Sequence, residues 1–133
     1  MNPDYRRPII IADDTPDVRG TLVAFLSEFF SDNTPKIDEV VDGAELVRKV
    51  NQNPNYGLIF TDNDMPELNG IEAIKQIRKS YSNIPIIGIT GRVTEEVLSG
   101  FLDAGANDFI AKPISLDTFF EVVQQHYQSN GTI

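Results

Sequence analysis

The sequence contains no cysteine and no long apolar run. Without cysteine the chain can form no disulfide, no thiolate metal site and no cysteine nucleophile, which fits a reducing compartment. Arg6 and Arg7 precede an apolar stretch, but this stretch covers only residues 9–12, which is too short for the core of a signal peptide. No segment approaches the run of about 18 apolar residues that spans a bilayer. We therefore expect a soluble, cytoplasmic protein with no membrane segment.

Basic residues are also scarce. The chain has 11 lysines and arginines against 20 aspartates and glutamates, which gives a formal net charge of -9. A surface of this sign repels the phosphate backbone of a nucleic acid. We expect no direct binding to DNA or RNA.

The length and composition are those of one globular domain. Of the 133 residues, 41% are apolar and 23% are charged. A domain of this size buries about two thirds of the surface of its unfolded chain, so a core can form without disulfides. The sequence contains no repeat or low-complexity segment. We predict a single domain over residues 1–133, with a folded core from about residue 7 to about residue 128.

Short apolar segments alternate with amphipathic segments along the whole chain. Short apolar runs are typical of buried strands, and apolar residues spaced by three or four are typical of helices. The predicted strands cover residues 9–12, 37–41, 58–61, 84–89 and 108–111, and we expect a helix after each. Four side chains are suited to cap these helices, namely Thr15, Asp42, Thr94 and Ser115. Ile114 and Phe119 are spaced to form a hydrophobic staple around the last of them.

Polar residues directly follow four of the predicted strands. They are Asp13 with Asp14, Asp62, Thr90 and Lys112. The strands are continuous apolar runs, which indicates that both sheet faces are covered and predicts a parallel, doubly wound α/β fold. Ligands of such open sheets bind beyond the carboxyl ends of the strands. We therefore expect these residues to meet at one edge of the sheet.

This set of residue types is suited to phosphoryl transfer. Three carboxylates within hydrogen-bonding range repel one another, and a bound cation relieves the repulsion. The pair Asp13-Asp14 alone could equally cap a helix, but the addition of Asp62 favours a cation site of hard oxygen ligands, for Mg²⁺ or Mn²⁺. A carboxylate can also attack phosphorus, and we predict that Asp62 is this nucleophile. Lys112 and Thr90 would then contact phosphoryl oxygens through an ammonium and a hydroxyl.

Four motifs, in order, resemble the signature of the receiver domains of two-component response regulators. They are Asp13-Asp14, the string DNDMPELNG at residues 62–70, Thr90-Gly91 and Lys112-Pro113. The resemblance covers essentially the whole chain. It implies a flavodoxin-like fold with five helices and five parallel strands in the order 2-1-3-4-5. It also implies that Asp62 accepts a phosphoryl group from a sensor histidine kinase or a histidine phosphotransfer protein.

The same resemblance implies further roles. Mg²⁺ is expected at Asp14, Asp62 and the backbone carbonyl of Asp64, with Asp13 assisting through water. The protein would be a switch and not an enzyme, apart from Mg²⁺-dependent phosphorylation and dephosphorylation of itself. An output protein is expected to bind the surface formed by the fourth helix, fifth strand and fifth helix. Phe109 matches the aromatic switch position of this family, although plain core packing would explain a phenylalanine there equally well.

Two residues near this site depart from the family's pattern, and the position of Asp64 varies in the family. Asp64 adds a carboxylate two residues after Asp62, and Arg92 follows Thr90 by two residues. We expect both to face the entrance of the site. Our hypothesis is that Asp64 and Arg92 interact across the opening and tune how long the phosphoryl group survives attack by water. The resemblance further implies a cis peptide bond before Pro113.

Other interpretations stay open at this point. The chain could be a receiver excised from a larger hybrid kinase or regulator, although its initial methionine and its last residues favour a natural chain. The spacing of Asp62 and Asp64 also matches haloacid-dehalogenase-like phosphatases. That family needs a further acidic motif after the lysine, whereas only Asp117 and Glu121 follow Lys112. A flavin-binding protein would share the fold, but acidic residues after the first strand would repel its phosphate.

Overall fold

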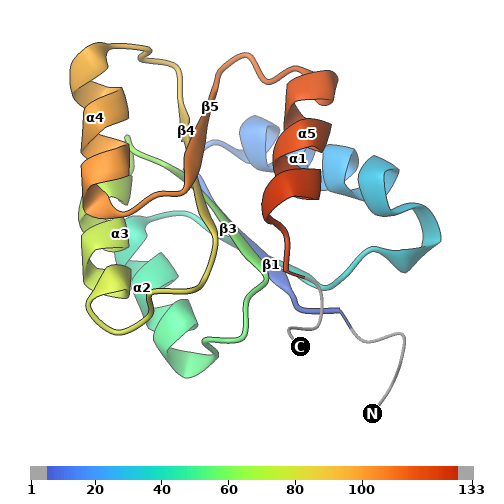
Figure 1. The fold of residues 1–133 in the computed structure, drawn as a ribbon, viewed down its shortest axis with the longest axis horizontal. Coiled ribbons are helices and arrows are strands. Elements are labelled where there is room, and N and C mark those ends of the chain that lie inside the picture. Colours follow the sequence, from blue (N-terminus) through green and yellow to red (C-terminus); the bar gives the residue numbers. More distant parts are fainter. Residues whose placement is uncertain (1–5, 129–133) are drawn as a thin grey trace.

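The computed structural model describes residues 6–128, which form a five-stranded parallel sheet between two layers of helices (Figure 1). The strands are β1 (Ile9–Ala12), β2 (Ile37–Val40), β3 (Leu58–Asp62), β4 (Ile86–Thr90) and β5 (Asp108–Ala111). The helices are α1 (Pro16–Phe30), α2 (Gly43–Gln52), α3 (Gly70–Arg78), α4 (Glu95–Ala104) and α5 (Leu116–His126), with a 3-10 turn at Ser31–Asn33. The strand order is β2-β1-β3-β4-β5, so the predicted flavodoxin-like topology is confirmed. None of the helices within residues 6–128 has the length and apolar character that crossing a membrane requires.

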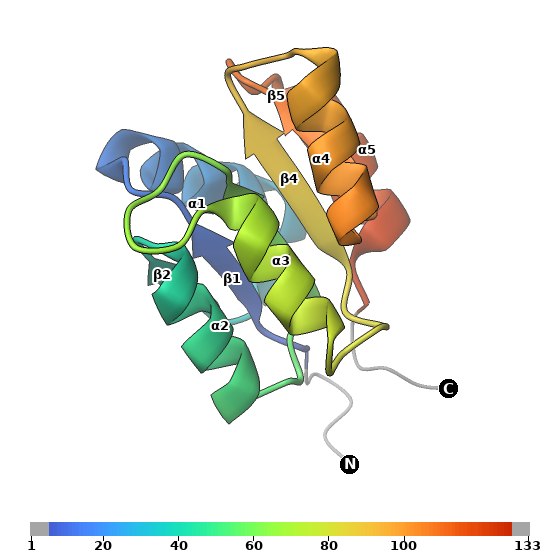
Figure 2. The same cartoon turned by 90° about the vertical axis from the view of Figure 1, so that its left-hand side faces the viewer.

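The two layers of helices bury opposite faces of the sheet. Helices α1 and α5 cover one face, and α2, α3 and α4 cover the other (Figures 1 and 2). Successive residues of β1 alternate between the two cores: Ile9 and Ile11 pack with α1 and α5, whereas Ile10 and Ala12 pack with the other three helices. Because both faces are buried, every residue of the strand is apolar, which explains the continuous runs in the sequence.

Four strand boundaries differ from the prediction, and two of them are extensions by one residue, since β3 ends at Asp62 and β4 at Thr90. β4 begins at Ile86, two residues late, because Pro85 has no N–H to donate to a neighbouring strand. The Pro85 carbonyl still accepts a hydrogen bond of 2.9 Å from the Ile59 N–H. β2 ends at Val40, one residue early, and the side chain of Val41 is turned outward enough for the residue to be 43% exposed.

Three of the four predicted helix caps are present. In each, the side chain accepts a hydrogen bond from the backbone N–H three residues later, and the residues are Asp42 (2.7 Å), Thr94 (3.2 Å) and Ser115 (3.1 Å). The prediction for Thr15 is wrong, because its side chain makes no capping bond and its hydroxyl lies 3.4 Å from a carboxylate oxygen of Asp14. Ile114 and Phe119 belong to the same apolar cluster, as expected for a staple.

Candidate functional site

The structure brings three carboxylates and one ammonium together at the carboxyl ends of β1, β3 and β5. Lys112 Nζ lies 3.2 Å from Asp13 Oδ2 and 3.5 Å from Asp62 Oδ1. One carboxylate oxygen from each of Asp13, Asp14 and Asp62 lies within 4.8 Å of the other two. The Asp13 and Asp62 side chains are 0% and 7% exposed, whereas Asp14 is exposed. The Lys112–Pro113 peptide bond is cis, as the family resemblance implies.

Crowding changes the proton affinities at this site. Burial raises the pKa of the Asp62 carboxyl from 3.8 to about 6, and the charge of Asp13 adds to the rise, while Lys112 and a backbone hydrogen bond from Asn63 partly offset it. Burial alone would lower the pKa of Lys112, but the charges of Asp62 and Asp13 outweigh that effect and raise it. At neutral pH Lys112 is therefore a cation, and Asp62 is an anion that a further positive charge would stabilise.

The backbone N–H, the carbonyl and both carboxylate oxygens of Asp13 are hydrogen-bonded. Its N–H donates to the Val40 carbonyl of β2 at 3.1 Å. Its carboxylate oxygens accept from the Thr15 N–H at 2.8 Å and from Lys112 Nζ at 3.2 Å. Its carbonyl oxygen accepts from Arg19 Nη1 at 2.7 Å. The sequence alone does not indicate these contacts of Arg19, because an arginine early in an amphipathic helix is normally solvated. Its place shortly after the two strand-end aspartates is the one signal for them.

The loop from β3 to α3 fixes the position of Asp62, which is the last residue of β3. Gly70 begins α3, and a Cβ atom at this residue would lie only 2.1 Å from the Asp62 carbonyl oxygen. Asn63 accepts hydrogen bonds from the N–H groups of Gly70 and Ile71, each at 3.0 Å. The carbonyl of Asp64 receives no hydrogen bond from residues 6–128. It is therefore available to a ligand.

Asp64 and Arg92 make the contact expected across the entrance of the site. Arg92 Nε lies 3.6 Å from Asp64 Oδ2. The side chain of Arg92 is 69% exposed and that of Asp64 is 57% exposed, so this ion pair adds little to the stability of the fold. The influence of the pair on phosphoryl lifetime stays a hypothesis.

Thr90 is the last residue of β4 and Phe109 lies on β5, and the surroundings of their side chains differ. The Thr90 hydroxyl accepts a hydrogen bond of 2.9 Å from the Arg92 N–H, so it is engaged by the loop that follows β4. Phe109 on β5 is only partly buried and lies outside both apolar clusters of the described residues. A Cβ atom at Gly91 would meet nothing nearer than the Lys112 side chain, at 4.0 Å. There is open space next to Thr90.

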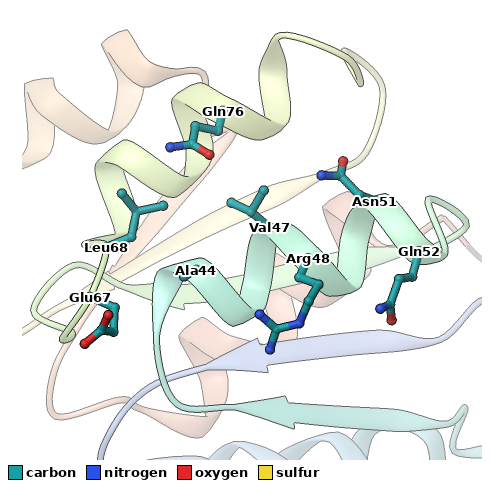
Figure 3. A pocket seen from close by; sticks show the side chains of 8 residues that line it. All are labelled: Ala44, Val47, Arg48, Asn51, Gln52, Glu67, Leu68 and Gln76. Atoms are coloured by element: carbon teal, nitrogen blue, oxygen red, sulfur yellow. The ribbon is translucent and has the colours of Figure 1, made fainter.

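A separate groove of about 570 Å³ lies between α2 and α3 (Figure 3). Its lining residues are Ala44, Val47, Arg48, Asn51, Gln52, Glu67, Leu68 and Gln76. None of them belongs to the carboxylate cluster. The groove is therefore not part of the candidate site.

Comparisons with known proteins agree on one family. A family model described as the response regulator receiver domain matches residues 9–124. The chain is 34% identical over 122 residues to the CAI-1 autoinducer sensor kinase/phosphatase CqsS of Vibrio cholerae, across 90% of this chain and 17% of that protein. It is 37% identical over 90 residues to two-component response regulator 24 of Arabidopsis thaliana, across 68% of this chain and 65% of that protein.

Solved structures give the same result. One is the receiver domain of sensor histidine kinase PA1611 from Pseudomonas aeruginosa PAO1, which has a magnesium ion coordinated in its active site cleft. It shares 26% identity and a TM-score of 0.79 with this chain, across 90% of this chain and 96% of the other. The chain spans less than two thirds of the length of the two curated relatives described above. By the extent of the match to the family model, the chain belongs to the response regulator receiver domain family.

Proposed function

We propose that the protein is a phosphoacceptor switch of two-component signalling, formed by a single receiver domain over residues 1–133 and acting in the cytoplasm. Asp62 takes a phosphoryl group from a phosphohistidine of a sensor kinase or a histidine phosphotransfer protein. The bond from phosphorus to the histidine nitrogen breaks as a bond to a carboxylate oxygen of Asp62 forms. The observation that carries this proposal is the buried Asp62 carboxylate, which lies 3.5 Å from Lys112 Nζ within the carboxylate cluster. Lys112 then pairs with a phosphoryl oxygen.

The residues present fit a hard divalent cation. The donors that lie together are carboxylate oxygens of Asp13, Asp14 and Asp62, and the cluster contains no imidazole or thiolate. Asp14, Asp62 and the Asp64 carbonyl would hold Mg²⁺ or Mn²⁺, with Asp13 acting through water. When bound, such an ion neutralises charge on the phosphoryl oxygens. The magnesium ion in the receiver of PA1611 supports this assignment.

Thr90 and Phe109 are proposed to carry the signal outward. The Thr90 hydroxyl would exchange its bond with the Arg92 N–H for a bond to a phosphoryl oxygen, and Phe109 would turn into the space that this movement opens. β5 runs between α4 and α5 (Figure 1), and Leu102 of α4 is 49% exposed. These features support α4, β5 and α5 as the surface for an output protein, and the net charge of -9 supports a protein rather than a nucleic acid.

A hollow beside Lys112 is suited to receive the phosphodonor. This hollow of about 270 Å³ lies between the start of α1 and the segment after β5, and it includes Lys112, Pro113 and Ile114 from that segment. Asp17 and Val18 line it from α1. Since Lys112 contacts Asp62, a partner seated here would be near the phosphoacceptor.

The test is phosphorylation by a small-molecule donor. The protein is incubated with Mg²⁺ and acetyl phosphate, and its intact mass is measured. We expect a single phosphoryl adduct that Asp62→Asn abolishes and that Asp32→Asn, a change at an exposed acid after α1, retains. Steady hydrolysis of phosphate monoesters without an adduct would overturn the proposal.

A phosphatase of the haloacid dehalogenase type is the alternative that this measurement tests. That chemistry needs a second acidic metal-binding motif after the lysine. Asp117 and Glu121 are the two acids between Lys112 and residue 128, and both lie exposed on α5. The comparisons do not favour this alternative, because the family model that matches is the receiver domain.

A further inference from the structure

Arg19 connects three elements at the acidic end of the site. Its Nη1 donates to the carbonyl of Asp13 at 2.7 Å, and its Nε lies 3.1 Å from Oε1 of Glu39 on β2. Its own N–H donates to the Thr15 carbonyl at 3.1 Å. The Arg19 side chain is 16% exposed, so it is mostly packed against protein. The Arg19 side chain thus joins the residue after β1 to the neighbouring strand β2, while its backbone belongs to the first turn of α1.

The bond to the Asp13 carbonyl has a geometric consequence for Asp14. The carbonyl of residue 13 and the N–H of residue 14 belong to one planar peptide unit, so fixing the carbonyl fixes the plane from which the Asp14 Cα atom extends. The Asp14 side chain is exposed, and its hydrogen bond within the described chain is a contact of 3.4 Å from the Thr15 hydroxyl. The direction in which this side chain leaves the backbone is therefore set by the peptide plane that the Arg19 bond holds.

We propose that Arg19 is a positioning residue for the cation site, which holds the Asp13-Asp14 peptide so that the Asp14 carboxylate faces Asp62, and that Glu39 keeps the guanidinium in place. This inference rests on the proposed cation site. Arg19 acts through the backbone of Asp13 and not as a ligand. Such supporting contacts around metal ligands are typically worth about 10- to 100-fold in metal affinity.

A purely electrostatic role for Arg19 predicts the opposite result. A guanidinium near three carboxylates repels a divalent cation, so removing its charge would tighten Mg²⁺ binding. The Glu39 carboxylate at 3.1 Å offsets this charge, which leaves the pair with little net effect on the site. Positioning predicts weaker binding after Arg19 is removed, because the Asp14 carboxylate then loses its fixed direction. The sign of the change separates the two explanations.

The experiment is isothermal titration of Mg²⁺ into the metal-free protein, at a temperature at which circular dichroism shows each variant folded. We expect Arg19→Met to raise the dissociation constant by about tenfold or more. Arg19→Lys keeps the charge but cannot bond the Asp13 carbonyl and Glu39 with the same planar fork, so it too should weaken binding. Arg78→Met is the matched control, because Arg78 also bonds backbone carbonyls, those of Gly105 and Tyr81, beyond the other edge of the sheet. It should lower the melting temperature and leave the dissociation constant unchanged.

Each outcome is decisive. An unchanged Mg²⁺ dissociation constant in Arg19→Met would leave Arg19 a purely structural residue, and a lower one would make its role electrostatic, so either result overturns the proposal. If Arg19→Met does not fold, Arg19→Lys decides, because an affinity equal to the wild type contradicts positioning. A wild-type protein that binds no Mg²⁺ would overturn the proposed cation site and this inference with it. Wild-type binding with unchanged variants would overturn the inference alone.

Discussion

Replacement of Asp62 by asparagine is expected to stabilise the metal-free protein at neutral pH. Asparagine has nearly the shape of aspartate but carries no charge. In the wild type, the charged form of Asp62 is disfavoured by burial and by Asp13, and Lys112 offsets this only in part. The substitution removes the unfavourable charge together with the salt bridge to Lys112, and the raised pKa of Asp62 already reflects the balance of both effects.

The size of the effect follows from that pKa. The carboxyl has a pKa of about 6 in the folded protein against an ordinary value of 3.8. Between these values the folded protein holds a proton that the unfolded chain has lost, so the contribution of Asp62 to stability is full below about pH 4 and is lost as the pH rises through about 6. At about 1.4 kcal/mol per pKa unit, the loss is about 3 kcal/mol at neutral pH. The asparagine variant escapes this loss.

Urea unfolding followed by circular dichroism, in the presence of a chelator, measures the difference. At about pH 7.5 the free energy of unfolding of Asp62→Asn should exceed that of the wild type by up to about 3 kcal/mol, and the gap should close toward pH 4. Asp32→Asn removes the same charge from an exposed position and should show no comparable gap. Equal stabilities at pH 7.5, or a gap that widens on acidification, would refute the reasoning.

Three other predictions concern the surroundings of Asp62. Gly70→Ala should lower the free energy of unfolding by about 1–3 kcal/mol and slow phosphorylation, because the added Cβ would meet the Asp62 carbonyl. Gly20→Ala is the control in the same urea assay: a Cβ there would have no atom within 4 Å, so the free energy of unfolding should rise by up to about 1 kcal/mol. Arg92→Ala and Asp64→Asn should each shorten the half-life of the phosphoryl group, measured by single-turnover decay, by no more than about fivefold, because an exposed ion pair contributes about 1 kcal/mol or less. Decay at the rate of the wild type would reject the hypothesis that this pair tunes phosphoryl lifetime. Millimolar Mg²⁺ should raise the melting temperature of the wild type more than that of Asp62→Asn, because it binds the folded state, and an equal rise in both would contradict a site at Asp62.

The local parts of this fold were predictable from the sequence. The spacing of apolar residues and the identity of capping residues are local signals. Short stretches of sequence therefore predict the five strands, the helices and the caps at Asp42, Thr94 and Ser115. The meeting of Asp13, Asp62 and Lys112 was also predictable, because parallel strands that end at one sheet edge bring their next residues together. The parallel direction of the strands is enough to predict that these side chains lie close together, without any measured distance.

The failures share a physical cause, which is competition for hydrogen bonds. Threonine is a common helix-capping residue, but the Thr15 N–H donates to the Asp13 carboxylate and its hydroxyl lies toward Asp14, so the side chain makes no capping bond. The pair of Arg19 with Glu39 joins residues 20 positions apart, and the sequence carries no periodic signal for such a contact. The conformation of the Thr90 hydroxyl likewise depends on the loop after β4, which no local pattern describes.

The close approach of Gly70 to the Asp62 carbonyl also divides the positions around Asp62 into two kinds. At residue 70 a single added carbon would lie 2.1 Å from a backbone oxygen, so the space itself rejects every side chain. Asp64 and Arg92 belong to the loops that follow β3 and β4, but they extend into solvent, where side chains of many sizes fit. Substitutions are therefore tolerated at Asp64 and Arg92 and excluded at Gly70. Under the proposed roles of Asp62 and of the Asp64–Arg92 pair, substitutions in this domain would change the duration of a signal more readily than the ability to receive one.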